Sequence, residues 1–128
     1  MKYKLATGTP WEDTVGYSRL VRVGNIIEVA GTVAADKDGH PVGEGSVYEQ
    51  AVFIFNKIER ALHEAGASLK DVVRTRAFIT DISRYDEFAK AHNEYFDSVR
   101  PVSTLVEVSR LVDPRHLIEI EVSAVLEE

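Results

Sequence analysis

Two stretches near the end of the chain alternate apolar and polar residues, and they limit the fold more than any other feature. They run from Arg100 to Val108 and from Leu117 to Val125. Alternation with a period of two is typical of a β-strand that buries one face. It places carboxylates on the less apolar faces of both strands, at Glu107, Glu119 and Glu121. Like charges on adjoining strands are unfavourable, so these side chains must face something that offsets them.

The rest of the chain predicts two helices. The first begins at a capping box of Ser46 and Glu49, continues as an apolar stripe at helical spacing to Ala65, and stops at Gly66. The second is expected over residues 82–98 and ends before Pro101. The side chains that it is expected to bury are Tyr85, Phe88, Ala91, Tyr95 and Phe96.

Four further strands are expected near residues 3–5, 18–23, 26–32 and 72–80. Gly24 and Asn25 tolerate positive φ and predict a two-residue hairpin turn between two of them. Gly31 lies inside a strand pattern, which indicates a bulge or the close approach of another group. The residues from Thr9 to Asp13 are expected to form a turn. The apolar face of the 72–80 strand is expected to hold Val73, Thr75, Ala77 and Ile79.

The predicted fold class is α+β, because two amphipathic helices can cover only one face of a sheet this wide. The architecture is then a two-layer sandwich. The uncovered face is expected to carry charged and large apolar side chains, namely Glu107, Glu119, Glu121, Leu105, Leu117 and Phe78, with Arg22, Glu28, Arg74 and Arg76 if the register permits. Such a mixture favours a subunit interface. The alternative is a solvated face with cross-strand ion pairs.

Length, charge and composition restrict the function. The 128 residues make one domain, residues 1–128. The net charge of −6 makes nucleic acid an improbable partner, and no apolar run is long enough for a membrane. The chain has no cysteine, which agrees with a cytoplasmic location. Its four histidines lie far apart in the sequence on loops and helix surfaces, so no metal site is expected.

Several motifs together resemble the Rid family, also called the YjgF family, which contains the reactive-intermediate deaminases. The resemblance extends from about Gly16 to Val125. The motifs are Gly24-Asn25-Ile26-Ile27 with Gly31, the run from Ala65 to Thr75, Val106-Glu107-Val108-Ser109-Arg110-Leu111, and Ile118-Glu119-Ile120-Glu121. It implies a chorismate-mutase-like fold with a mixed six-stranded sheet, a homotrimer, and ligand clefts at the subunit boundaries.

The resemblance also implies an activity, the hydrolysis of enamines and imines to ammonia and a 2-keto acid without a metal or cofactor. Tyr17 falls on the family's cleft tyrosine and Gly31 on its cleft glycine. Glu119 falls on the glutamate assigned to water activation. A separate interpretation makes Glu119 and Glu121 either an acid–base pair or structural carboxylates that face arginines. Some family members are described as ribonucleases. The net negative charge of this chain argues against ribonuclease activity here.

Two positions depart from the family pattern. Ser103 stands where the family has the arginine that anchors the substrate carboxylate, and Ala30 replaces a cleft serine. A serine cannot form the bidentate ion pair that an arginine forms with a carboxylate. Arg100 could reach the same cleft, or it could be a cation at a helix C-terminus; Arg110 is expected to be structural.

Two functions remain open on these residues. The first is a binder of a small carbonyl or carboxylate metabolite in intersubunit clefts, with weak or altered deaminase activity. The second is a genuine enamine or imine deaminase that uses Glu119 and has Arg100 as a relocated anchor. Trp11, the single tryptophan, either covers one end of the core or contacts the ligand.

Overall fold

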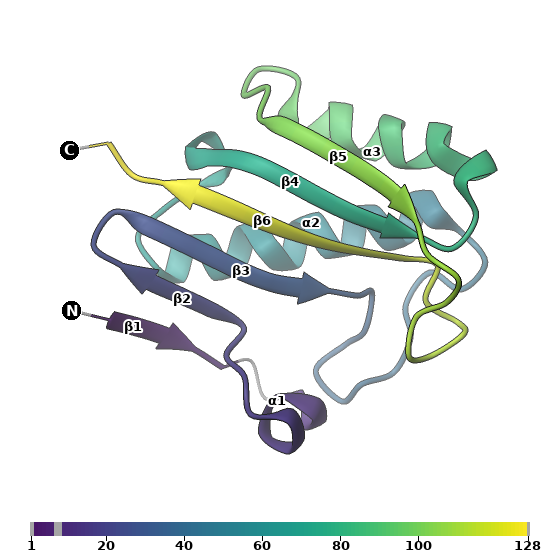
Figure 1. Cartoon of the computed structure of the whole chain (residues 1–128), viewed down its shortest axis with the longest axis horizontal. Coiled ribbons are helices and arrows are strands. Elements are labelled where there is room, and N and C mark those ends of the chain that lie inside the picture. Colours follow the sequence, from purple (N-terminus) through teal and green to yellow (C-terminus); the bar gives the residue numbers. More distant parts are fainter. Residues whose placement is uncertain (1, 7–8, 128) are drawn as a thin grey trace.

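The computed structural model describes residues 2–6 and 9–127, and in them the chain forms one mixed sheet with helices α2 and α3 on one face (Figure 1). In chain order the elements are β1 (Lys2–Leu5), α1 (Pro10–Val15), β2 (Leu20–Val23), β3 (Ile26–Thr32), α2 (Val47–Glu64), the 3₁₀ turn η1 (Leu69–Asp71), β4 (Val72–Ile79), the 3₁₀ turn η2 (Ile82–Arg84), α3 (Tyr85–Phe96), β5 (Val102–Glu107) and β6 (Ile118–Val125). The strand order is β1-β2-β3-β6-β4-β5. Only the β4–β5 pair is parallel. The predicted α+β class, with six strands in a mixed sheet, is confirmed.

Helix α2 forms where the cap and the apolar stripe predict it. Ser46 Oγ accepts a hydrogen bond from the backbone N–H of Glu49 at 3.0 Å. The chain leaves the helix at Gly66, whose φ of 85° suits glycine. The stripe packs against the sheet and forms the centre of the core, with Ala51, Ile54, Phe55, Ile58 and Leu62 almost fully buried. The helix therefore packs against one face of the sheet and leaves the other face uncovered.

The β2–β3 hairpin and the bulge in β3 also agree with the sequence. Val23 pairs with Ile26, so Gly24 and Asn25 form a two-residue turn. The register between β3 and β6 shifts between Val29 and Thr32, the segment that contains Gly31. A bulge of this kind bends the strand and redirects its side chains.

Three local expectations are wrong. The segment from Thr9 to Asp13 is mostly helical, because Pro10 begins α1. Tyr85 is 59% exposed, since it is the first residue of α3 and lies beyond the part of the helix that contacts the sheet. Val73 is also exposed, because an irregularity between β4 and β6 at this point buries Val72 instead.

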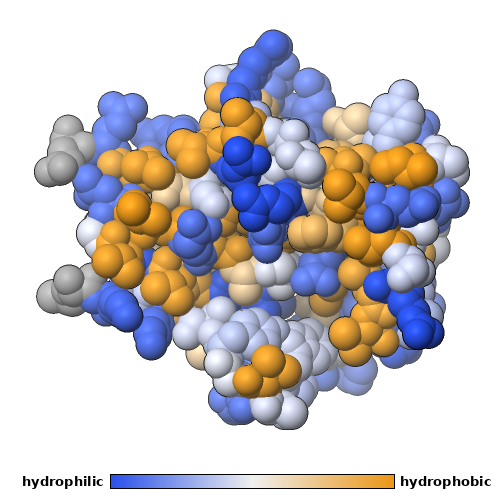
Figure 2. All heavy atoms as spheres, in the orientation of Figure 1, coloured by the Kyte–Doolittle hydropathy of each residue, from blue (hydrophilic) through white to orange (hydrophobic). Residues whose placement is uncertain are grey.

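The uncovered face differs in part from the expected one. Leu105 and Glu107 pair with Ala77 and Ile79 of β4, whose side chains are buried under the helices, so both lie on the helix side. Arg22 also lies on the helix side, where its Nη1 donates to the carbonyl of Ala65 at 2.6 Å. The other predicted members keep their place on the open face, which mixes charged and apolar side chains (Figure 2).

Candidate functional site

A cavity of about 310 Å³ lies at one end of the open sheet face, where β3 and β6 meet α1 and two loops. Tyr17, Gly31 and Glu119, which the family resemblance assigns to the site, all line it. The other lining residues are Trp11, Val15, Val33, Gly39, Val112, Asp113 and His116. Trp11 therefore contributes to the wall of this cavity. The lining is largely apolar, with a few polar groups directed at one space, which is the usual composition of a small-molecule site.

Gly31 lies directly against the carboxylate of Glu119, so a side chain at position 31 would displace this carboxylate from its present place. A Cβ at position 31 would overlap Glu119 Oε2. The φ angle of Gly31 is not positive, so the feature that distinguishes this glycine is its contact with Glu119 and not its backbone conformation. The bulge in β3 and the alternation of β6 thus bring the two residues together.

Arg19 supports the wall of the cavity from behind, and sequence analysis missed it. Its guanidinium is buried and donates from Nη1 to the carbonyl of Gly31 at 2.8 Å and from Nη2 to Tyr17 Oη at 3.1 Å. It also forms a buried ion pair with Glu12, with 3.6 Å between Nε and Oε2. No local pattern distinguishes this arginine from an exposed one. Its position fixes both the tyrosine and the bulge.

Burial shifts the proton affinities of three groups in the cavity wall. It raises the pKa of Glu119 above its ordinary value, although Arg19 nearby opposes the shift. It raises the pKa of Tyr17 as well. It lowers the pKa of His116, because an imidazolium is poorly solvated there. The cavity therefore holds a carboxyl that keeps its proton more readily and an imidazole that loses its proton more readily.

Gln50 explains how His116, expected at the surface, comes to be buried. Gln50 lies within the apolar stripe of α2 and is fully buried. Its Nε2 donates to the carbonyl of Arg115 at 3.0 Å, and its Oε1 accepts from the N–H of Leu117 at 2.8 Å. These bonds tie the loop before β6 to the helix on both sides of the histidine. A glutamine inside an apolar stripe is a sequence signal that could have indicated this arrangement, and the sequence analysis did not use it.

Ser103 and Arg100 lie at a different place, on the helix side of the edge strand β5. Ser103 pairs with the buried Thr75, and Thr75 Oγ1 donates to Ser103 Oγ at 2.8 Å. Thr75 Oγ1 also lies 2.9 Å from His92 Nε2. Arg100 and Ser103 border the same surface depression beside α3, and Arg100 is hydrogen-bonded to Asp97 there. Within one chain these residues share no cavity with Glu119.

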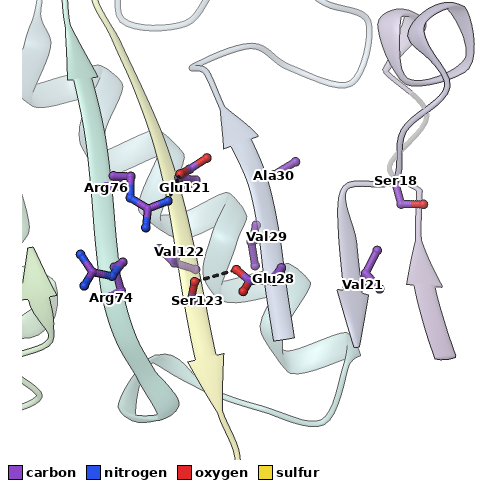
Figure 3. A pocket seen from close by; sticks show the side chains of 10 residues that line it. All are labelled: Ser18, Val21, Glu28, Val29, Ala30, Arg74, Arg76, Glu121, Val122 and Ser123. Atoms are coloured by element: carbon purple, nitrogen blue, oxygen red, sulfur yellow. Dashed lines mark hydrogen bonds and ion pairs between the residues drawn. The ribbon is translucent and has the colours of Figure 1, made fainter. Parts of the chain in front are cut away.

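Ala30 borders a third hollow, a depression of about 470 Å³ on the open sheet face (Figure 3). Strands β3, β6 and β4 each contribute charged or polar side chains to it. Arg76 Nη1 forms an ion pair with Glu121 Oε1 at 2.8 Å, and Ser123 donates to Glu28 at 2.6 Å. Glu121 is thus paired with an arginine and does not line the cavity of Glu119, which favours the structural interpretation of this carboxylate.

A cluster of possible metal-ligating groups occurs in the loop after β3. One ligand atom from each of Asp36, Asp38 and His40 lies within 4.8 Å of the others. Asp36 Oδ1 accepts hydrogen bonds from the backbone N–H groups of Asp38 and His40, both at 2.9 Å. Asp38 and His40 are exposed. The turn itself therefore accounts for the cluster.

Comparison with known proteins identifies the family. The family model described as Endoribonuclease L-PSP matches residues 9–126. The uncharacterized protein SCO2049 of Streptomyces coelicolor is 40% identical over 121 residues, which cover 94% of this chain and 90% of that protein. The 3-aminoacrylate deaminase RutC of Acinetobacter baylyi is 34% identical over 116 residues, 91% of this chain and 90% of its own. The crystal structure of Rv2704 from Mycobacterium tuberculosis has a TM-score of 0.89 and 40% identity, covering 98% of this chain and all of the other.

The fold and the cavity define the class, a two-layer α+β domain with a carboxyl-bearing pocket at one end of its sheet. Rv2704 is described as a member of the YjgF/YER057c/UK114 family. The chain belongs to this family, the YjgF or Rid family, as its motifs predicted. None of the helices in the described residues has the length and apolar composition needed to cross a bilayer.

Proposed function

We propose that this chain binds a small carbonyl or carboxylate metabolite in clefts between three copies of itself, with weak or altered deaminase activity. The observation that carries the proposal is the division of the predicted site. Tyr17, Gly31 and Glu119 line one cavity, and Ser103 and Arg100 border another depression. A second copy of the chain can bring the two halves together. The site is then an intersubunit cleft, as the family resemblance implies.

The open sheet face supports this assembly. It carries apolar side chains with large exposed fractions, including Ile26 at 55% and Val102 at 57%. Arg74, on the same face, forms no ion pair within the described residues and could bind an acidic group of a neighbouring copy. Contiguous exposed apolar surface on a small domain usually marks a contact. We include in this proposal that the chain forms a homotrimer and that it is located in the cytoplasm.

The chemistry of the Glu119 cavity supports a ligand with a reactive carbon–nitrogen or carbon–oxygen double bond. A carboxyl whose pKa is raised by burial keeps its proton more readily than an exposed one and can deliver it to a nitrogen or oxygen. One relative of this chain is described as a 3-aminoacrylate deaminase. With Ser103 in the position of the anchoring arginine, the substrate carboxylate lacks a guanidinium fork, so turnover is expected to be weak.

The second candidate is a full enamine or imine deaminase with Arg100 as the anchor. One observation favours it: Arg100 borders the same depression as Ser103 and is exposed. Its Nη2 and Nε are bound to Asp97, which leaves other guanidinium hydrogens free to bind a carboxylate.

An assay of ammonia release tests the proposal. The natural protein is given 2-iminopropanoate, generated in the assay, and its rate is compared with that of a family member that has the arginine. Binding of pyruvate is measured in parallel by calorimetry. Binding with slow release supports the proposal, and release at the rate of the comparison enzyme supports the second candidate. The absence of both binding and release contradicts both functions.

A further inference from the structure

Three side chains beside α3 are joined through one buried hydroxyl group. Thr75 is fully buried, and its Oγ1 donates to Ser103 Oγ at 2.8 Å. The same oxygen lies 2.9 Å from His92 Nε2. His92 and Ser103 both line the depression beside α3, which has a volume of about 420 Å³ and is called the α3 depression below. Two members of this polar unit therefore border a space that can hold a small molecule.

The single hydrogen of the Thr75 hydroxyl sets the direction of both hydrogen bonds. Because Thr75 donates to Ser103, its oxygen accepts from His92, and the proton of the neutral imidazole is on Nε2. His92 Nδ1 then carries a lone pair, and the Ser103 hydroxyl keeps its own hydrogen for another partner. The unit therefore offers a ligand one acceptor, on His92, and one donor, on Ser103.

The acceptor and the donor are both in contact with solvent. Ser103 is exposed. His92 Nδ1 forms no hydrogen bond within the described residues, and unlike Nδ1 of His116 it is not one of their buried unpaired atoms. The His92 ring packs against Phe88 and Phe96, with ring centroids 5.3 and 4.8 Å away, so its orientation is fixed. A ligand in the α3 depression can therefore meet a rigid imidazole.

The charges around the α3 depression do not favour a carboxylate. Its charged members are Asp97 and Arg100, which form an ion pair with 3.2 Å between Oδ1 and Nη2, so their charges offset each other. Burial lowers the pKa of His92, so this imidazole is neutral at pH 7. An ionised carboxylate has only acceptors, and one of its oxygens would meet the lone pair of His92 Nδ1. A primary amide has nearly the same shape and supplies both an acceptor and a donor.

We propose that the α3 depression binds the carboxamide of a small 2-oxo or 2-imino amide, with Ser103 donating to the amide oxygen and His92 Nδ1 accepting from the amide nitrogen. This inference rests on the proposed function and deepens it, because it names the group that takes the place of the carboxylate. Phe88, Phe96 and Pro101 line the same depression and provide apolar contacts beside the amide. The serine at position 103 then changes the class of substrate as well as weakening the binding of acids.

Calorimetry with a matched pair of ligands tests the proposal. Pyruvamide and pyruvate differ only in the amide, and each is titrated into the natural protein. We expect pyruvamide to bind at least about tenfold more tightly, because only the amide satisfies His92 Nδ1. His92→Phe keeps an aromatic ring in this position but removes the acceptor, so it should abolish the preference. Tyr95→Phe removes a hydroxyl of the same helix that binds Asn56 outside the depression, and it should keep the preference. Tighter binding of pyruvate, or a preference that His92→Phe retains, would overturn the proposal.

Nitrogen NMR of the natural protein is a second test, and it needs no variant. The signals of the His92 ring should show the proton on Nε2, and the Nδ1 signal should move when pyruvamide is added. A proton on Nδ1, or an Nδ1 signal that bound pyruvamide leaves unchanged, overturns the inference.

The same titrations separate this inference from the proposed function. A protein that binds pyruvate but not pyruvamide keeps the proposed function and rules out the amide site. A protein that binds pyruvamide and releases no ammonia supports the amide site and rules out only the deaminase activity. A protein that binds neither ligand contradicts both.

Discussion

The hydroxyl of Thr75 donates a hydrogen bond to Ser103 Oγ at 2.8 Å, across the parallel pair of β4 and β5. The bond holds Ser103 at the position where the family resemblance places a carboxylate anchor. Thr75 is fully buried, and its Oγ1 also lies 2.9 Å from His92 Nε2. A larger side chain at position 103 can therefore turn outward without leaving the buried threonine unpaired.

We expect Ser103→Arg to raise deamination of 2-iminopropanoate about tenfold, because a hydrogen bond to a charged group contributes about 1.5–3 kcal/mol. Ammonia release measures the effect. Arg100→Ala in the natural protein is the control and should change the rate little, since the Arg100 guanidinium is held by Asp97. Loss of release in Arg100→Ala would instead identify Arg100 as the anchor. No gain in Ser103→Arg would mean that the cleft differs from the family's in more than this residue.

Gly31→Ala should destabilise the fold by up to about 1 kcal/mol, because the added methyl group forces the flexible end of the Glu119 side chain to move aside. The free energy of unfolding in urea measures this cost. A double-mutant cycle isolates the cause: in a Glu119→Ala background the same substitution should cost clearly less. Equal costs in the two backgrounds would contradict the close approach of these residues.

The sequence predicted most of the framework because its signals are local. A capping serine, a helical apolar stripe and a following glycine are sufficient to define α2, and Gly24-Asn25 is sufficient for the hairpin. Glu119 could be placed because β6 alternates cleanly, with Ile118 and Ile120 buried on either side of it. The family resemblance assigned Glu119 and Gly31 to the same cleft, and the direct contact between them was not predicted.

Long-range packing decided the features that the sequence did not predict. Strand β5 has apolar residues on both faces, so only its register with β4 shows that Leu105 and Glu107 lie under the helices. The burial of Arg19 depends on Glu12, in a helix that was expected to be a turn. The burial of His116 depends on Gln50, 66 positions earlier in the sequence (116 − 50). No window of neighbouring residues contains Gln50 and His116 together. Arg19 and Glu12 are close in sequence, but their contact depends on helix α1, which the pattern did not predict.

Glu119 should make the stability of the protein depend on pH. Burial raises its pKa in the folded state, so the folded protein binds this proton more tightly than the unfolded chain does. Its contribution is fully present below the unfolded pKa of about 4.3 and is lost as the pH rises through the folded pKa. Glu119→Gln should remove this loss. The variant should therefore gain stability relative to the natural protein as the pH rises from about 4 to 7, as measured by urea unfolding at each pH. A difference that stays constant over this range would contradict the shift.

The last prediction concerns the assembly on which the shared cleft depends. Light scattering at micromolar concentration should give three times the chain mass of 14.3 kDa. Val106→Asp places a charge on the open sheet face, where Val106 pairs with Phe78 and is 41% exposed. We expect this variant to dissociate, because a buried unpaired carboxylate in an interface is strongly unfavourable. His63→Asp introduces the same carboxylate on the exposed side of α2 and should leave the mass unchanged. A monomeric natural protein would rule out the trimer. A trimer that tolerates Val106→Asp as well as it tolerates His63→Asp would place the interface elsewhere, and the two halves of the site would then need another way to meet.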